Sequence, residues 1–286
     1  MTARGRNGAR ERMRLRSDAE QSVELSWFAL TDVGRRRETN QDSYLTLPPV
    51  FAVADGMGGH SAGEIASEAV VRRLAELGGP QAVTDRDIES ALGDAVDDIE
   101  LDAGESELGA GTTVTGVAFG ADAVHPSWRV FNIGDSRVYQ YLDGELKQLT
   151  TDHSVVQHLI DTGAITPDEA EYHPHANVIT RAVGFNEPPL PDFSSVPMLS
   201  GQRLLICSDG LTKELTDTGI KHFLEHSDTV ETAARALVQH SLDNAGRDNV
   251  TVVVIEVHAV GVSPSPQGLN DDAGDTVEVP ALASSE

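Results

Sequence analysis

Residues 50–59 read Val-Phe-Ala-Val-Ala-Asp-Gly-Met-Gly-Gly, and this stretch decides the fold. Its first five residues are apolar, which indicates a short buried strand. The strand ends at Asp55, and the glycines after it separate the strand from a helix that we predict over residues 61–77. The stretch therefore places an acidic side chain at the end of a strand, at the edge of a sheet.

Four further aspartates lie in short polar motifs, most of them beside a strand-like apolar run. They are Asp42, Asp135, Asp209 and Asp248. Acids at strand ends converge at one edge of a sheet, and converging acids repel each other unless a cation lies between them. The pattern therefore predicts more than one bound divalent cation. Because the candidate ligands offer only oxygen atoms and the ten histidines show no ligand-like spacing, we expect Mg²⁺ or Mn²⁺.

Apolar runs in the rest of the chain alternate in pairs without a helix between them. Predicted strands cover residues 111–119, 128–133, 138–142, 145–149, 203–207 and 249–257. Predicted helices cluster in two blocks, at 61–77 with 88–101 and at 229–244. This order favours mainly antiparallel sheets in an α+β layered architecture rather than a doubly wound one.

Composition limits the partners and the compartment. The chain has 286 residues, a formal net charge of −25 and one cysteine, and its length allows one large domain or two small ones. The acidity argues against nucleic acid or an anionic membrane as a partner, because like charges repel. A single cysteine allows no internal disulfide, so we expect a cytoplasmic protein. No run of about twenty apolar residues is present, so we expect no membrane insertion.

The two ends of the chain differ from the densely patterned part between them. Residues 1–20 are basic and polar without a period, which predicts a disordered N-terminus, and Met13 offers an alternative start. Residues 24–257 form the predicted domain, within which 152–185 read as an insertion near the site. Residues 259–286 are rich in Ser, Pro, Gly and Asp, which predicts a flexible acidic tail.

Seven motifs, in this order and spacing, resemble those of bacterial metal-dependent serine/threonine protein phosphatases of the PPM type, also called type 2C. They read Gly-x-x-Arg-x-x-Asn-Gln-Asp (34–42), Ala-Asp-Gly-Met-Gly-Gly (54–59), Gly-Thr-Thr (111–113), Asn-Ile-Gly-Asp-Ser-Arg (132–137), Leu-Thr-x-Asp-His-Ser (149–154), Cys-Ser-Asp-Gly-Leu (207–211) and Asp-Asn-Val-Thr (248–251). The resemblance covers residues 24–257. It implies a four-layer α-β-β-α sandwich, with two central antiparallel sheets flanked by helices.

The resemblance also implies roles for the aspartates at two core metal ions. Asp55 would bridge both ions, and the carbonyl of Gly56 would bind one of them. Asp209 and Asp248 would complete the ligands of the other ion, and Asp42 would hold waters bound to the metals. Two such ions share a bridging water and convert it to hydroxide at neutral pH.

Further roles follow from the same resemblance. Asp135, together with Asp209, would form a weaker third metal site. Arg37 would clamp the phosphate of the substrate, because the planar arginine fork matches two phosphate oxygens. Residues 152–185 would form a flap beside the active site. Lys213 stands where a polar or acidic residue is more usual, and we expect its charge to weaken the third site.

The implied function is hydrolysis of phosphoserine and phosphothreonine in proteins by a metal-bound hydroxide, with Asp55, Asp209 and Arg37 as catalytic residues. The expected partners are phosphorylated proteins and a serine/threonine kinase that the enzyme opposes in bacterial signalling. Two alternatives stay open: a pseudophosphatase that binds without turnover, and a phosphohydrolase acting on small phosphate esters or phosphohistidine. Met57 occupies the position of a histidine general acid in animal members, so the group that protonates the leaving group is unassigned.

Overall fold

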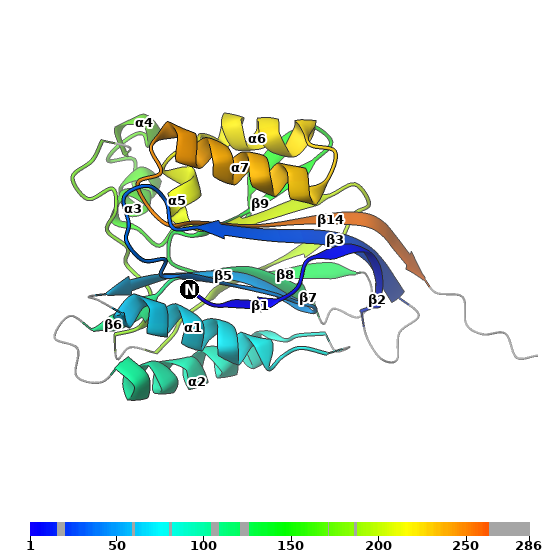
Figure 1. Ribbon diagram of the computed structural model, residues 1–286, viewed down its shortest axis with the longest axis horizontal. Coiled ribbons are helices and arrows are strands. Elements are labelled where there is room, and N and C mark those ends of the chain that lie inside the picture. The colour runs from blue at the N-terminus through cyan, green and yellow to red at the C-terminus, as the bar shows by residue number, and fades with distance from the viewer. Residues whose placement is uncertain are drawn as a thin grey trace, which may run out of the picture.

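The computed structural model describes residues 1–15, 21–58, 61–79, 82–103, 109–120, 126–170, 172–185 and 188–262. In these residues two β-sheets pack face to face, and helices cover the outer face of each sheet (Figure 1). This arrangement confirms the predicted α-β-β-α sandwich. No helix in the described part of the chain is both long and apolar enough to cross a lipid bilayer.

The first sheet has eight strands, with a main path of β1-β4-β5-β7-β8-β12. Their bounds are Ala3–Gly5 (β1), Asp42–Leu47 (β4), Val50–Gly58 (β5), Val114–Phe119 (β7), Ser127–Ile133 (β8) and Asp192–Pro197 (β12). Two short strands, β6 (Ala110–Thr112) and β11 (Val183–Gly184), extend the sheet beside β5. The β1–β4 pair is parallel and the other pairs named are antiparallel, as the sequence predicts for most of the sheet.

The second sheet has six strands in the order β10-β9-β13-β14-β3-β2, and its pairs are antiparallel. The bounds are Gly8–Arg14 (β2), Gln21–Asp32 (β3), Arg137–Leu142 (β9), Glu145–Gln148 (β10), Arg203–Cys207 (β13) and Val250–Val262 (β14). The two longest strands of this sheet, β3 and β14, pair with each other from Asp32–Val250 to Gln21–Val262.

Two helices cover each sheet. Helices α1 (Ala62–Ala75) and α2 (Asp85–Ala103) pack against the first sheet, and α6 (Asp217–His226) and α7 (Val230–Asn244) pack against the second. The buried positions of α7, such as Ala233, Ala234 and Leu237, recur at helical spacing, which is why the helix lies flat on the sheet. Three short helices, α3 (Val155–Asp161), α4 (Pro167–Ala170) and α5 (Asp209–Thr212), lie together at one end of the sandwich, on the left in Figure 1.

Aromatic side chains fill the space between the two sheets. The rings of Trp27 and Phe51 lie edge to face with centroids 5.5 Å apart, and Phe51 meets Trp128 at 6.3 Å. All three side chains are fully buried. Edge-to-face packing is the arrangement that aromatic quadrupoles favour, so these rings hold the sheets at a fixed spacing.

The end of the sandwich that carries the short helices is where the acidic motifs lie. Asp42 opens β4 and stands opposite Asp55 of β5 in the antiparallel register. Opposite residues in antiparallel strands point to the same face of a sheet. Strands β8 and β13 end on the same edge, just before Asp135 and Asp209, and β14 begins there, just after Asp248.

The N-terminus differs from the expected disordered tail, and we correct that expectation as far as residue 15. Strand β1 pairs with β4, and β2 pairs with β3. The indole N–H of Trp27 donates to the carbonyl of Arg6 at 2.6 Å, and Gly8 lies so close that an added Cβ would come within 2.4 Å of the indole ring. Backbone pairing and one aromatic ring hold this segment. Because buried apolar side chains contribute little to it, its sequence shows no apolar period from which strands could be predicted.

Two further element boundaries differ from the prediction. Strand β14 continues through Val262, so residues 259–262 belong to the sheet rather than to the expected tail. Residues 263–286 lie outside the described part of the chain. The strand predicted over 111–119 is interrupted at Thr113, whose backbone N–H donates to the carbonyl of Asp55 at 2.9 Å. The limits of the domain and of the flap stay predictions.

Candidate metal centre

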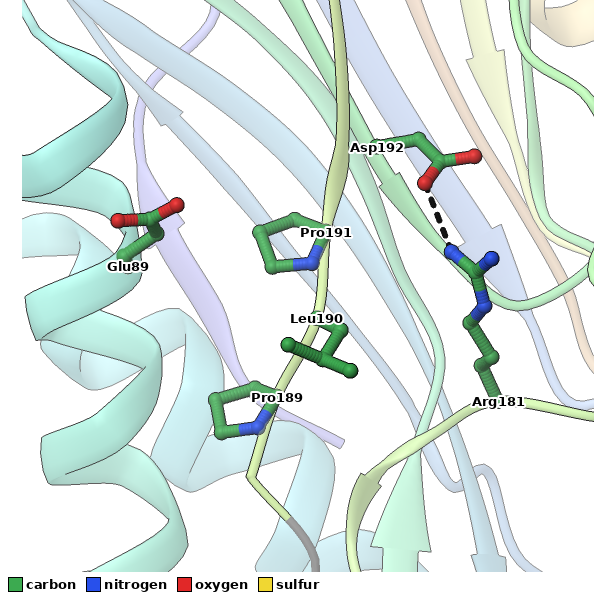
Figure 2. Close-up of a pocket in the computed structure, with 6 residues that line it drawn as sticks. All are labelled: Glu89, Arg181, Pro189, Leu190, Pro191 and Asp192. Carbon is green, nitrogen blue, oxygen red and sulfur yellow. Dashed lines mark hydrogen bonds and ion pairs between the residues drawn. The ribbon is translucent and has the colours of Figure 1, made fainter.

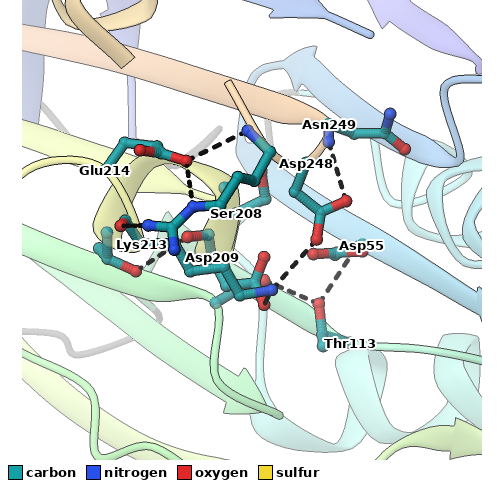
Figure 3. Close-up of polar contacts among 12 residues, drawn as sticks. Asp55, Thr113, Ser208, Asp209, Lys213, Glu214, Asp248 and Asn249 are labelled. Atoms are coloured by element: carbon teal, nitrogen blue, oxygen red, sulfur yellow. Dashed lines mark hydrogen bonds and ion pairs between the residues drawn. The ribbon is translucent and has the colours of Figure 1, made fainter. Parts of the chain in front are cut away.

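Five aspartates from five separate segments lie together at this edge of the sandwich. Asp42 and Asp55 come from the first sheet, Asp135 follows β8, and Asp209 and Asp248 border the second sheet. The other four all act electrostatically on Asp55. The structure therefore brings together every aspartate that the sequence singled out, and Figure 3 shows part of the group.

Two threonines of the next segment hold the backbone of Asp55. Its backbone N–H donates to the hydroxyl of Thr113 at 3.1 Å, and its carbonyl accepts the hydroxyl of Thr112 at 2.9 Å. Burial, followed by the charges of the four other aspartates, raises the pKa of Asp55 well above its ordinary value. Positive charge placed nearby would favour the ionised form of this carboxylate.

Asp42 ties the two sheets together. One of its carboxylate oxygens accepts the hydroxyls of Thr251 on β14 at 2.6 Å and of Ser208, which directly follows β13, at 2.8 Å. Burial outweighs these two hydrogen bonds and raises the pKa of Asp42 to about 6, with Asp209 and Asp248 adding to the shift. Its second oxygen, Oδ1, is buried and has no hydrogen-bond partner among the described residues.

Asp209 and Asp248 share a single lysine. The Nζ of Lys213 lies 2.5 Å from Oδ2 of Asp209 and 3.1 Å from Oδ2 of Asp248, as Figure 3 shows. Burial opposes ionisation of Asp248, but the charges of Lys213 and Arg37 outweigh it and hold its pKa below the ordinary range. Oδ1 of Asp209 is buried and finds no partner in the described part of the chain.

Asp135 occupies the border of the group next to the insertion. Burial raises its pKa to about 7, with further contributions from Asp209 and Asp152, while the charge of Lys213 acts in the opposite direction. Asp152 is itself held by Arg137, whose guanidinium donates to it at 2.7 to 3.0 Å. Arg137 therefore connects the start of β9 with the segment that carries Asp152.

The donor atoms fit hard divalent cations. Buried carboxylate oxygens without partners on Asp42 and Asp209 are unusual, because buried polar atoms normally find a hydrogen bond. Cations that take oxygen ligands would satisfy them and relieve the repulsion among the five acids. Among the described residues no three His, Cys, Asp or Glu side chains stand in the arrangement of a formed metal site. The partnerless oxygens and the lack of a formed metal arrangement are compatible, because Asp209 and Asp248 pair with Lys213 and Arg37 instead of facing a common centre.

The loop that carries Arg37 is fastened beside Asp248. The Nε of Arg37 lies 2.8 Å from Oδ1 of Asp248, and its NH2 donates to Oδ2 at 3.0 Å. Asn249 holds the loop from below, since its side chain accepts the N–H of Gln41 at 2.8 Å and donates to the carbonyls of Val33 and Thr39. The half-exposed guanidinium therefore stands at the mouth of the acid group.

Close backbone approach explains one glycine of the first motif. Gly34 has φ of +80°, and an added Cβ would lie 2.2 Å from the carbonyl oxygen of Asp248. Only glycine fits this position, so the arginine loop passes directly over the strand end that carries Asp248.

Residues that support the acids were not identified from the sequence. They are Thr113, Ser208, Thr251 and the side chain of Asn249. All four belong to the quoted motifs, and this was the only signal in the sequence that could have indicated them. Which hydroxyl reaches which carboxylate depends on how the two sheets face each other, and spacing along the chain does not carry that information.

The insertion contacts the group through His153. The backbone N–H of Gly134 donates to Nδ1 of His153 at 3.1 Å, so the ring proton is on Nε2, which donates to Asp192 at 3.0 Å. Arg181 also binds Asp192, at 2.7 Å. This chain of contacts connects the residue before Asp135 with the outer rim of the insertion.

A shallow pocket of about 500 Å³ lies outside this rim. It is lined by Glu89, Arg181, Pro189, Leu190, Pro191 and Asp192, and Figure 2 shows α2 on one side of it and the Arg181–Asp192 ion pair on the other. None of the five aspartates lines it. The pocket is therefore separate from the acid group.

The fold and the acid group define a class of protein. Residues 34–245 match the family described as protein phosphatase 2C, and the chain belongs to this family.

Individual relatives give the same result. The chain is 37% identical over 243 residues to the serine/threonine protein phosphatase PstP of Mycobacterium tuberculosis, covering 84% of this chain and 46% of that protein. It is 34% identical over 239 residues to the serine/threonine phosphatase stp of Listeria monocytogenes, covering 79% of this chain and 93% of that protein. The chain thus spans less than half the length of its mycobacterial relative.

A solved structure is also similar. The crystal structure of the catalytic domain of PstP in complex with two manganese ions matches with a TM-score of 0.72 and 36% identity, over 82% of this chain and 99% of that one.

Proposed function

We propose that this chain hydrolyses phosphoserine and phosphothreonine in proteins with the help of Mn²⁺ or Mg²⁺. The observation that carries the proposal is the group of five aspartates, with partnerless buried oxygens on Asp42 and Asp209. Family membership and the likeness to a manganese-bound relative point to the same activity.

In this proposal Asp55, the carbonyl of Gly56, Asp209 and Asp248 would hold the core ions, and Asp42 would orient waters beside them. Bound there, two hard divalent cations would neutralise the charge of a phosphoryl group and acidify a water for attack on phosphorus. Asp42 and Asp55 face each other across the β4–β5 pair, so the sheet positions these two carboxylates before an ion binds. A third ion between Asp135 and Asp209 belongs to the same proposal.

Arg37 binds the phosphate in this proposal. Its guanidinium is half exposed and already directed at Asp248, so it stands beside the place where the phosphoryl group would be held. The planar guanidinium could bind two phosphate oxygens if a metal cation replaced it as the partner of Asp248. Lys213 and Arg37 hold the pKa of Asp248 below its ordinary value, which favours the ionised carboxylate that a metal ion would bind.

The proposal also covers the protein partners of the chain and its location in the cell. We expect phosphorylated proteins as substrates and a bacterial serine/threonine kinase as the opposing enzyme, in the cytoplasm. The insertion at 152–185 is proposed as a flap, supported by the contacts from His153 to Gly134 on one side and to Asp192 on the other.

Replacement of Asp209 tests the activity. Asp209→Asn should lower Mn²⁺-dependent hydrolysis of a phosphothreonine peptide at least about a hundredfold, because a charged metal ligand and its electrostatic stabilisation are lost. Initial rates with Mn²⁺ and with EDTA measure the effect.

The matched control is Asp143→Asn. Asp143 lies in the turn between β9 and β10 with φ of +50°, a conformation that asparagine also adopts, so its rate should equal that of the wild type. Full Mn²⁺-dependent activity in folded Asp209→Asn would refute the proposed mechanism. Wild-type protein that binds phosphopeptide without hydrolysing it would identify a pseudophosphatase instead.

A further inference from the structure

Lys213 is a partly buried cation that pairs with two of the five aspartates. It is the residue that ends α5, and its ammonium lies 2.5 Å from Asp209 and 3.1 Å from Asp248. Its side chain is only 29% exposed. An ammonium placed between two carboxylates in a partly buried site makes charge-assisted hydrogen bonds, which are about twice as strong as neutral ones.

The backbone around Lys213 fixes this position. The N–H of Lys213 donates to the carbonyl of Asp209 at 2.8 Å, which places both side chains on one face of the turn. The carbonyl of Lys213 accepts the guanidinium of Arg247 at 2.7 Å, and Arg247 in turn pairs with Glu214 at 2.8 Å. The lysine is therefore held in place from its own backbone and does not reach the acids by chance.

The charges in reach of Lys213 come from several elements. Asp209 lies on α5 itself, and Asp248 precedes β14. The charge of Lys213 offsets part of the rise in the pKa of Asp135, which follows β8, and Arg37 pairs with Asp248 as Lys213 does. Burial alone would lower the pKa of Lys213, but Asp209 and Asp248 outweigh it and raise the pKa, so the side chain is a cation under all ordinary conditions.

We propose that Lys213 is an internal counter-cation that competes with a divalent ion for Asp209 and Asp248. The inference rests on the proposed function, because it assigns these two carboxylates to metal. From the sequence we expect the lysine to weaken the third site, between Asp135 and Asp209, and this stays a prediction. The contacts with Asp209 and Asp248 place the ammonium on the pair assigned to a core ion as well.

Two opposite consequences follow from this position. Without metal, Lys213 offsets the repulsion among five acids and stabilises the fold. When an ion binds to Asp209 and Asp248, the ammonium has to leave, so the ion binds less tightly than it would without the lysine. Lys213 thereby sets the metal concentration at which the core site fills, and makes this chain require more Mn²⁺ than a variant without the charge.

The test uses the full chain and Mn²⁺ alone as the probe. Lys213→Met keeps the length of the side chain and removes the charge, and Lys213→Arg keeps the charge. Lys147→Met is the matched control, because Lys147 is an exposed lysine on β10. Isothermal titration with Mn²⁺ gives the dissociation constants, and thermal unfolding in EDTA gives the stability of the metal-free protein.

Lys213→Met should bind Mn²⁺ about tenfold more tightly than the wild type, the size expected for loss of one competing charge-assisted contact. In EDTA the same variant should unfold at a lower temperature, and excess Mn²⁺ should remove that difference. If it folds only with Mn²⁺ present, the stabilising role is confirmed directly. Lys213→Arg and Lys147→Met should show neither the tighter binding nor the loss of stability.

Equal Mn²⁺ affinity and equal metal-free stability in Lys213→Met and the wild type would overturn this inference while leaving the proposed function intact. Absence of Mn²⁺ binding in both the wild type and Lys213→Met would instead overturn the proposed function, and the inference with it.

Discussion

At the scale of single residues, two aspartates of the acid group have raised pKa values. The pKa values of Asp42 and Asp135 are raised to about 6 and about 7, in both cases mainly by burial. In the unfolded chain the same groups would titrate near 3.8. Between these values the folded protein binds more protons than the unfolded chain, so lower pH favours the folded state of the metal-free protein.

This gives a prediction of opposite sign to the usual acid denaturation. In EDTA, the melting temperature should rise by on the order of 5 °C as the pH falls from about 8 to about 5. Asp42→Asn removes one of the titrating groups and should reduce the rise. With excess Mn²⁺ the trend should reverse, because protons then compete with the ion for the carboxylates. A melting temperature in EDTA that stays level or falls toward pH 5 would contradict the assignment.

Spacing along the chain was enough to find the acids but not their counter-charges. Each aspartate stands in a motif beside a strand end, and strand ends meet at sheet edges, so their convergence was predictable. The position of Lys213 against Asp209 and Asp248 depends on the turn of α5 and on which way β14 enters the sheet. Hydroxyl contacts such as Thr251 to Asp42 cross between sheets, and no pattern within one segment encodes them.

At the scale of elements, many of the strands and the three long helices were predictable because their side chains carry a clear period, but β3, β4, β12 and α6 were not predicted. The run Val50–Ala54 became β5, and the helices predicted at 88–101 and 229–244 became α2 and α7. Edge strands β1 and β2 were missed because their side chains are mostly exposed. What holds them is backbone pairing, and that leaves no trace in hydrophobicity.

The N-terminal strands carry a prediction of their own. Deletion of residues 1–12 removes β1, most of β2 and the Arg6 carbonyl that accepts the Trp27 indole N–H. The ring of Trp27 then loses its cover from Gly8 and the guanidinium of Arg6, which lies 5.7 Å from it.

We expect a red shift of tryptophan fluorescence and a melting temperature lowered by about 5 °C, as for loss of a few kcal/mol in a domain of this size. Asn7→Ala is a milder version, since its side chain accepts the N–H of Ala29 at 2.9 Å. An unchanged spectrum and unchanged stability in the truncated protein would show that these strands contribute nothing to the fold.

At the scale of the whole molecule, net charge sets the approach of substrates. The chain carries a formal charge of −25, and a phosphopeptide adds its own negative phosphate. Basic residues beside the phosphothreonine turn the long-range repulsion between peptide and protein into attraction. Such charge complementarity raises association rates at low salt.

We therefore expect phosphothreonine peptides with Arg and Lys flanks to have about tenfold higher kcat/KM at low ionic strength than peptides with Asp and Glu flanks. The difference should shrink as salt is raised toward about 0.3 M, because screening shortens the reach of the field. Rates on p-nitrophenyl phosphate, which has no flanking charges, provide the control for direct effects of salt on the enzyme. Equal rates for both peptides at low salt would show that the acidic surface has no part in selection.

The double contact of Asp42 with Thr251 and Ser208 has a consequence for the mechanics of the sandwich. Further inside, aromatic rings keep the two sheets apart at a spacing that no ion or proton can alter. At the acid edge the same sheets are joined through a carboxylate whose charge depends on its surroundings. Packing in the interior thus joins the sheets whatever the pH, while the link at the acid edge depends on the protonation state of Asp42.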